Sequence, residues 1–263
     1  MRRAKSSSLL VMFLKFLFAP KKENVQRRNG RTKSIGKNHS QIPVIDLSEE
    51  ERSSWNLKLL MRLDWYLFEE LTCQLFRLLD YKAELTKQGA DGGIDVLLFQ
   101  PGEYKPHTAI QCKSWTNRTV GVKEIRELLG SMVHGGFKDG IFVTTNVFTD
   151  EARRFAFDSK IGLMDGPFFI ETLQSLEGGY QKELLESTLK DDCFMPTCPS
   201  CGTKMILRTA KKGNTVGKQF YGCRSYPKCR TLFQIARPPK IEKLMAAEKP
   251  WLHPDDKYIP SIT

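Results

Sequence analysis

Three polar side chains have the types and spacing needed for chemistry on a phosphodiester bond. Asp95 lies in the otherwise apolar segment GIDVLLF (93–99), and Gln111 and Lys113 lie in the segment AIQCKSW (109–115). Successive side chains of a strand point to opposite faces, so Gln111 and Lys113 are expected to share one face. A carboxylate, an amide oxygen and an ammonium group on neighbouring strands would suit a metal ion beside a phosphate.

A divalent metal ion would account for these residue types together. Mg²⁺ (or Mn²⁺) takes oxygen ligands, and we expect them from the Asp95 carboxylate, the Gln111 side chain and the Cys112 backbone carbonyl. Lys113 would hold the attacking water and balance phosphate charge. The ion would also offset the unfavourable burial of an unpaired carboxylate. The alternative is that these residues form a structural polar cluster or an inactive site.

A helical acid is expected to complete the site. Residues 64–80 place apolar side chains at helical spacing, and Asp64 is the expected N-cap. Glu69 lies on the flank of this apolar stripe, whereas Glu70 lies on the solvated face. We therefore predict Glu69 as the helical acid, with a purely structural role as the alternative.

The surrounding pattern predicts an α/β fold with a mixed sheet flanked by helices. Within strand 93–99, Ile94, Val96 and Leu98 are expected on one face, and Val133 is expected to face inward from its helix. The expected helices cover residues 64–80, 121–135, 150–159 and 167–176, and the expected strands lie near 82–87, 93–99, 108–114, 140–145 and 161–166.

Four cysteines near the C-terminus have the spacing of a structural zinc site. Cys198 and Cys201 form a CPSC pair, and Cys223 and Cys229 form a second pair. Four thiolates in two pairs favour a closed tetrahedral zinc site, and the short segment around them needs the metal to fold. Disulfide bonds are the alternative.

Basic and aromatic side chains alternate within this cysteine module. Aromatic rings can stack on bases while Lys and Arg contact phosphates, and Phe220 and Phe233 are instead expected to cover the small core. The predicted DNA-binding residues are Lys218, Arg224, Tyr226, Lys228 and Arg230.

The net charge of +11 is unevenly distributed along the 263 residues. Residues 1–40 carry 11 Lys/Arg and one acid, residues 41–193 carry 17 and 25, and residues 194–263 carry 13 and four. The two basic ends favour a polyanionic partner, although RNA or anionic lipid would fit charge alone. This pattern divides the chain into a basic arm (1–40), an α/β domain (41–193), a cysteine module (194–235) and an irregular tail (236–263).

The cysteines and the N-terminal residues bear on location. Seven cysteines without a disulfide framework fit a reducing compartment, so we expect a cytoplasmic protein. The apolar run at 9–18 is too short to cross a bilayer. Peripheral attachment to the inner membrane through this run is the alternative.

The order and spacing of these motifs resemble the Mrr family, restriction endonucleases of the PD-(D/E)xK superfamily. The resemblance covers residues 60–176 and implies a restriction-endonuclease-like fold, with metal-binding and catalytic roles for Asp95, Gln111, Lys113 and Glu69. The superfamily usually has an acid at the position of Gln111. The glutamine removes one negative charge, which should weaken metal binding. The motifs are FE (68–69), DGGID (91–95), QCK (111–113), VGVKEIRELLG (120–130), GIFVTT (140–145) and FTDEARRFA (148–156).

The cysteine module is similar to the C4 zinc ribbon at the C-terminus of bacterial type IA topoisomerases. This similarity covers residues 196–235 and implies DNA contact without topoisomerase activity, because no topoisomerase catalytic domain accompanies it.

The two resemblances together predict a type IV-like, Mg²⁺-dependent endonuclease that cleaves modified foreign DNA. Its expected partner is double-stranded DNA, with single-stranded DNA possible at the ribbon and a homodimer possible in solution. The alternatives are a structure-specific junction or repair nuclease, and a DNA-binding protein with an inactive nuclease core.

Overall fold

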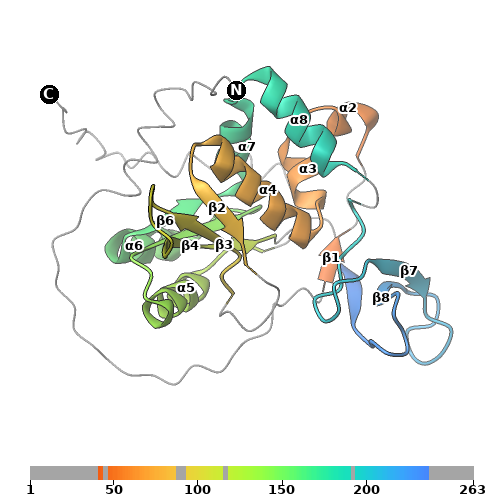
Figure 1. The fold of residues 1–263 in the computed structure, drawn as a ribbon. Coiled ribbons are helices and arrows are strands. Elements are labelled where there is room, and N and C mark those ends of the chain that lie inside the picture. The colour runs from red at the N-terminus through yellow and green to blue at the C-terminus, as the bar shows by residue number, and fades with distance from the viewer. Residues whose placement is uncertain (1–40, 44–46, 87–92, 115–117, 191–192, 237–263) are drawn as a thin grey trace, which may run out of the picture.

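The computed structural model describes residues 41–43, 47–86, 93–114, 118–190 and 193–236. A five-stranded mixed sheet with helices on both faces forms the larger part, and a four-stranded sheet lies at one end of it (Figure 1). The expected arm and most of the expected tail lie outside these residues. No helix in the described part of the chain is long and apolar enough to cross a membrane.

The five-stranded sheet has the order β2-β3-β4-β5-β6. The pairs β2–β3 and β3–β4 are antiparallel, whereas β4–β5 and β5–β6 are parallel. The sheet is therefore mixed, as predicted. Its strands are β2 (Lys82–Leu85), β3 (Val96–Phe99), β4 (Pro106–Lys113), β5 (Asp139–Thr144) and β6 (Ile161–Met164).

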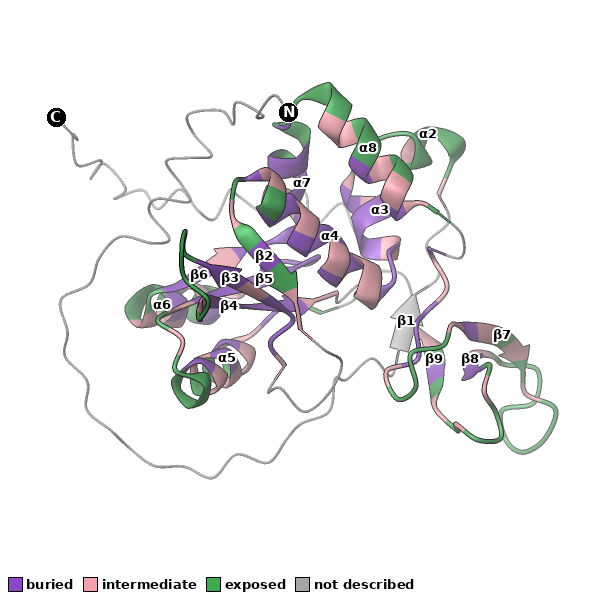
Figure 2. Ribbon diagram, in the orientation of Figure 1, coloured by how far each residue is buried: buried purple, intermediate pink, exposed green. Residues whose placement is uncertain are grey.

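Helices cover both faces of this sheet and bury two separate apolar clusters. The first cluster joins α3, α4, α7 and α8 to one face, and the second joins α5 and α6 to the other (Figure 2). The sheet is therefore the middle layer of an α/β/α sandwich. The helices are α3 (Leu57–Arg62), α4 (Trp65–Leu78), α5 (Val122–Gly135), α6 (Asp150–Ser159), α7 (Gly166–Gln174) and α8 (Gly178–Thr188).

The face that each strand residue buries follows strict alternation in β4 but not around Asp95. In β4, Ile110 and Cys112 pack in the cluster with α4, and Ala109 packs in the cluster with α5. Ile94 packs with α5, whereas Val96 packs with α4. The prediction that Ile94 and Val96 share a face is thus wrong, because the regular strand begins only at Val96 and the chain just before it does not follow the alternation.

The helix predictions are confirmed in extent but not in every side chain. Helix α5 buries Ile125, Leu128 and Met132, whereas Val133 is 76% exposed. The prediction that Val133 faces inward is wrong, because the apolar stripe passes through Leu128 and leaves Val133 outside it. Asp64 stands at the N-cap position of α4, but its side chain makes no capping hydrogen bond.

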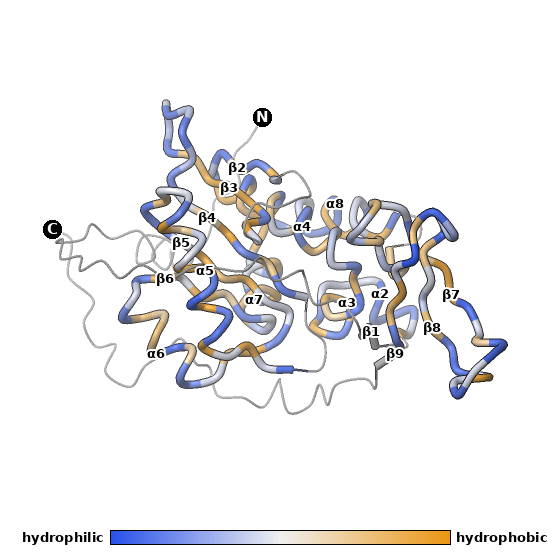
Figure 3. The backbone as a smooth tube through the Cα atoms, turned by 90° about the horizontal axis from the view of Figure 1, so that it is seen from below, coloured by the Kyte–Doolittle hydropathy of each residue, from blue (hydrophilic) through white to orange (hydrophobic). Residues whose placement is uncertain are grey.

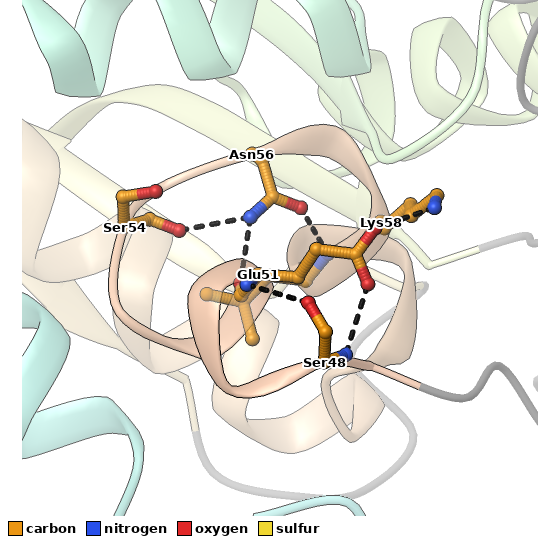
Figure 4. A network of polar contacts seen from close by, with 6 residues as sticks. Ser48, Glu51, Ser54, Asn56 and Lys58 are labelled. Atoms are coloured by element: carbon orange, nitrogen blue, oxygen red, sulfur yellow. Dashed lines mark hydrogen bonds and ion pairs between the residues drawn. The ribbon is translucent and has the colours of Figure 1, made fainter.

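Two short helices precede α4 and are held by local caps. The Ser48 hydroxyl and the Glu51 carboxylate bond each other's backbone N–H groups at the start of α2 (Glu49–Arg52) (Figure 4). Asn56 caps α3 by accepting the N–H of Leu59. These reciprocal bonds satisfy N–H groups that a helix cannot pair internally.

The second sheet has the order β1-β9-β8-β7 and contains the cysteine module. Its hairpins are antiparallel, but β1 pairs in parallel with β9, so residues from the N-terminal side complete this sheet. Figure 3 shows β9, β8 and β7 together at one end of the molecule. The strands are β1 (Gln41–Pro43), β7 (Met205–Thr209), β8 (Gln219–Cys223) and β9 (Leu232–Ala236).

Gly166, the first residue of α7, provides a test of how tightly this helix meets the sheet. A Cβ there would lie 2.3 Å from the backbone oxygen of Thr145. We expect Gly166→Ala to lower the free energy of unfolding by about 1–3 kcal/mol, measured by chemical denaturation. The control is Gly130→Ala at an exposed position of α5, where a Cβ meets no atom within 4 Å, so this change should be neutral or stabilising. Equal effects of the two changes on the free energy of unfolding would contradict the packing of α7 described here.

Candidate active site and zinc site

Three of the four predicted catalytic residues, Asp95, Gln111 and Lys113, lie where β3 begins and β4 ends. Because β3 and β4 are antiparallel, the segment before Val96 lies beside the last residues of β4; Val96 itself pairs with Ile110. Lys113, the last residue of β4, pairs with Thr144 at the end of β5. Asp95, Gln111 and Lys113 therefore lie at the same end of the neighbouring strands β3 and β4, in the middle of the sheet.

Asp95 is held against the backbone of β4. Its carboxylate Oδ2 accepts the N–H of Cys112 at 2.8 Å, and its own N–H donates to the carbonyl of Ile110 at 2.8 Å. Asp95 is only 3% exposed. The carboxylate is thus fixed beside the residue that separates Gln111 from Lys113.

Gln111 carries a buried oxygen without a partner. The residue is 4% exposed, and its Oε1 has no hydrogen-bond partner among the residues that the structure describes. The nitrogen end of the same amide lies against Gly93, where a Cβ would approach Nε2 to 2.7 Å. Gly93 has a φ of 83°, which favours glycine as well. An orphaned acceptor of this kind is unfavourable unless a cation or a donor binds it.

Lys113 is held through its backbone while its side chain is partly exposed. Its carbonyl accepts the Thr144 hydroxyl at 2.8 Å and the Thr145 N–H at 3.2 Å. These two bonds join the end of β4 to the end of β5, so the chain cannot slide past its neighbour at this point.

Glu69 is the buried acid of α4. It is 7% exposed, whereas Glu70 is partly exposed, as the apolar stripe predicts. Helix α4 packs on β2, β3 and β4, and β4 holds Gln111 and Lys113. Burial raises the pKa of the neighbouring Tyr66, and the Glu70 carboxylate raises it further. Glu69 is therefore a buried carboxylate on the helix that covers these strands.

The residues present fit a divalent cation. Asp95 and Gln111 offer oxygen atoms, which Mg²⁺ prefers, and Gln111 Oε1 is a buried acceptor that nothing in the described chain satisfies. The Cys112 carbonyl, the third predicted ligand, belongs to the residue whose N–H binds Asp95. The donor set carries less negative charge than two carboxylates would.

Sequence reasoning missed a polar group beside these residues. Thr144 and Thr145 are fully buried and Asn146 is 2% exposed, at the end of β5. Asn146 accepts the Val147 N–H, and Thr144 accepts the Asn146 N–H through its hydroxyl. The run of polar residues directly after the apolar segment GIFV was the available signal.

The four predicted zinc ligands come together. Their sulfur atoms all lie within 4.8 Å of one another, with Cys198–Cys229 at 3.6 Å and Cys201–Cys223 at 3.4 Å. A disulfide would need about 2.05 Å, and the cysteines are free thiols. Tetrahedral zinc with bonds of about 2.3 Å requires sulfurs about 3.8 Å apart. The cluster therefore fits a tetrahedral zinc ion, and its sulfurs are too far apart for disulfide bonds.

Hydroxyl groups around the sulfurs favour thiolates. Thr203 lies 3.2 Å from the Cys201 sulfur, and Thr231 lies 3.4 Å from that of Cys229. The Thr203 hydroxyl, followed by its backbone N–H, lowers the pKa of Cys201 to about 6, while burial raises the pKa of Cys198 to about 11. Zinc binds thiolates, so hydroxyl donors beside Cys201 and Cys229 agree with these residues being zinc ligands.

The five predicted DNA-binding side chains are exposed on the ribbon, with Tyr226 61% exposed. Phe233 is buried and Phe220 partly buried, consistent with their predicted place in the core. Sequence reasoning missed Arg208, whose guanidinium lies 5.8 Å from the ring centre of Tyr226. Its stem crosses Gly222, where a Cβ would lie 2.9 Å from Cδ. Arg208 was missed because it lies well before Lys218 in the sequence, outside the segment that holds the other predicted cations.

Comparison with known families matches both parts of the chain. Residues 60–173 match a family described as restriction endonuclease, and residues 196–238 match one described as topoisomerase DNA-binding C4 zinc finger. These ranges contain the candidate catalytic residues and the four cysteines respectively.

Individual relatives resemble separate parts of the chain. The type IV methyl-directed restriction enzyme EcoKMrr of Escherichia coli K12 is 30% identical over 125 residues, 45% of this chain and 41% of that enzyme. DNA topoisomerase 1 of Methanothermobacter thermautotrophicus is 32% identical over 62 residues, 24% of this chain and 8% of that protein. The chain thus spans about two fifths of the first relative and far less of the second.

Among solved structures, the MspJI restriction endonuclease in complex with a 27-mer oligonucleotide aligns with a TM-score of 0.40 and 19% identity. That alignment covers 67% of this chain and 43% of the other.

The zinc site predicts a defined metal content. We expect the purified chain to contain one zinc ion per molecule, measured by elemental analysis, and Cys223→Ser to lose it because four thiolates close the site. Cys73→Ser, which changes a buried cysteine outside the cluster, is the matched control and should keep the zinc. Equal zinc contents in both variants would contradict the assignment.

Proposed function

We propose that the chain is a metal-dependent DNA endonuclease, because residues 60–173 match a restriction endonuclease family and residues 196–238 match a topoisomerase DNA-binding C4 zinc finger. The observation that carries the proposal is the buried, unpartnered Oε1 of Gln111 at the strand ends that also hold Asp95 and Lys113.

The proposed roles follow from these positions. A bound Mg²⁺ or Mn²⁺ would polarise the phosphate and lower the pKa of a water molecule. Asp95, Gln111 Oε1 and the Cys112 carbonyl would hold the ion, and the Cys112 N–H keeps the Asp95 carboxylate in place at 2.8 Å. Lys113 would orient the attacking water and balance charge on the phosphate. Glu69 would add the helical carboxylate.

DNA binding would rely on the ribbon. Residues 194–236 contain eight Lys/Arg and no acid, whereas residues 41–193 contain more acids than bases. Phosphate contacts by Lys and Arg supply most sequence-independent affinity. We propose that Lys218, Arg224, Lys228 and Arg230 hold the duplex or an opened strand, with Tyr226 available for stacking on a base.

The substrate we propose is modified DNA, supported by the similarity to a methyl-directed restriction enzyme. Two copies would act together, because a double-strand break usually uses two active sites. A structure-specific junction or repair nuclease is the second candidate, and an inactive DNA-binding protein is the third. Methylated, unmethylated and branched DNA, each with and without Mg²⁺, would separate these functions.

Removal of the Lys113 ammonium tests the catalytic proposal. We expect Lys113→Ala to lower the cleavage rate of methylated plasmid by at least about 100-fold, because the ammonium acts at the reacting phosphate. Binding of the same DNA in Ca²⁺ should change much less. Lys182→Ala on exposed α8 is the matched control and should cleave as the unchanged protein does. Indistinguishable activity of the Lys113 variant would contradict the assigned role.

A salt titration tests the ribbon. Changing Lys218, Arg224, Lys228 and Arg230 to Ala should reduce the slope of log Kd against log salt by about 3.6 units, because each phosphate contact contributes about 0.9. The slope is measured by fluorescence anisotropy in the Lys113→Ala background. A control that removes four exposed cations of the nuclease domain, Lys123, Lys138, Arg154 and Lys182, should change the slope less; the reverse order would contradict DNA binding by the ribbon.

A further inference from the structure

The buried carboxylate of Asp64 joins the ribbon to the nuclease domain. Its side chain is fully buried and accepts the Thr197 N–H at 2.9 Å and the Thr197 hydroxyl at 2.5 Å. The Lys204 ammonium lies 3.1 Å from the same carboxylate. Asp64 precedes α4, while both partners belong to the ribbon, so three polar contacts cross between the two parts.

Neighbouring contacts reinforce this junction. The indole N–H of Trp65 donates to the Thr197 carbonyl at 2.7 Å, and Arg62 donates to the Phe194 carbonyl at 2.8 Å. Arg62 also lies over the Phe194 ring, 5.2 Å from its centre. The backbone N–H of Asp64 donates to the Cys193 carbonyl. Three of the four residues at 62–65 therefore hold the entrance to the ribbon.

The ribbon is also held on its other side. Strand β1 pairs with β9 through Gln41–Gln234 and Ile42–Ile235. The ribbon is thus joined to the N-terminal part of the chain at an edge strand as well as through its linker.

The same junction reaches both functional sites. Thr197 directly precedes the zinc ligand Cys198, and the Cys198 N–H donates to the carbonyl of Thr203, the residue before Lys204. On the other side, Asp64 starts the helix that carries Glu69 one turn after Trp65. Few bonds therefore separate the zinc ligands from the helical acid of the candidate active site.

We propose that Asp64 is a positioning residue that couples zinc binding in the ribbon to the placement of helix α4, so that the ribbon is a fixed arm of the nuclease domain. The proposal rests on the zinc and nuclease functions proposed above. A fixed arm would set the distance between DNA held by the ribbon and the bond that is cut. Loss of zinc would release Thr197 and Lys204 and loosen the start of α4.

Hydrogen exchange measures this coupling without requiring cleavage. A zinc-selective chelator is added to the full chain with Mg²⁺ retained, and exchange is followed in peptides covering 65–72. We expect exchange there to rise by about tenfold or more in the unchanged protein, because local opening becomes easier. Helix α6, on the opposite face of the sheet, should respond little.

Two variants of the junction should reduce this response, and Asp64→Ala should abolish it. In Asp64→Ala, exchange of 65–72 should be raised before chelation and should not rise further. Thr197→Val removes one hydroxyl and keeps the backbone contacts, so its exchange response to chelation should be intermediate. This variant keeps the test possible if Asp64→Ala proves too unstable. Asp165→Asn is the matched control, since this buried acid caps α7 and contacts Arg153 within the nuclease domain. It should retain the full zinc response.

The two proposals fail in different ways. If chelation leaves exchange of 65–72 unchanged in the natural sequence, or if Asp64→Ala responds to zinc as fully as Asp165→Asn does, the coupling is wrong. Neither result depends on the Lys113 experiment. Where cleavage is measurable, Asp64→Ala should also spread the cut positions on a defined substrate, while Asp165→Asn keeps the original pattern.

Discussion

The hydrogen bond from the Cys112 backbone N–H to the Asp95 carboxylate is the contact on which the candidate active site depends. A carboxylate this deeply buried needs a partner that does not move, and a backbone N–H in a central strand meets that need. It brings the start of β3 to the end of β4, next to Gln111 and Lys113. The apolar clusters on both faces of the sheet hold these strand ends in register.

The irregular chain before Val96 explains why a carboxylate can occupy this position. Ile94 and Val96 pack on opposite faces although regular alternation would put them together. Gly93, with its positive φ, lets the chain pass close to the Gln111 amide. The backbone thus departs from strand geometry at the position of the proposed chemistry. Irregular backbone is often found at functional sites.

Much of this arrangement could be predicted from the sequence, because hydrophobic periodicity and cysteine spacing are local signals. Helix α4, the strand holding Gln111 and the four zinc ligands all follow from such patterns. Contacts set by tertiary structure could not. Nothing local shows that Asp64 binds Thr197 and Lys204 instead of capping its own helix, or that Arg208 lies beside Tyr226. The face of Ile94 was missed for the same reason, since alternation assumes a regular strand.

The pairing of β1 with β9 also has a consequence for biosynthesis. Gln41 leaves the ribosome long before Gln234, so this edge of the second sheet can close only after nearly all of the described chain has been made. Contacts between residues so distant in sequence form late, because closing a long loop is slow. The nuclease layers can therefore assemble during translation, whereas the metal-binding module reaches its final attachment only near the end of synthesis. An early stop codon or a stalled ribosome would then yield a nuclease domain that lacks the zinc ribbon.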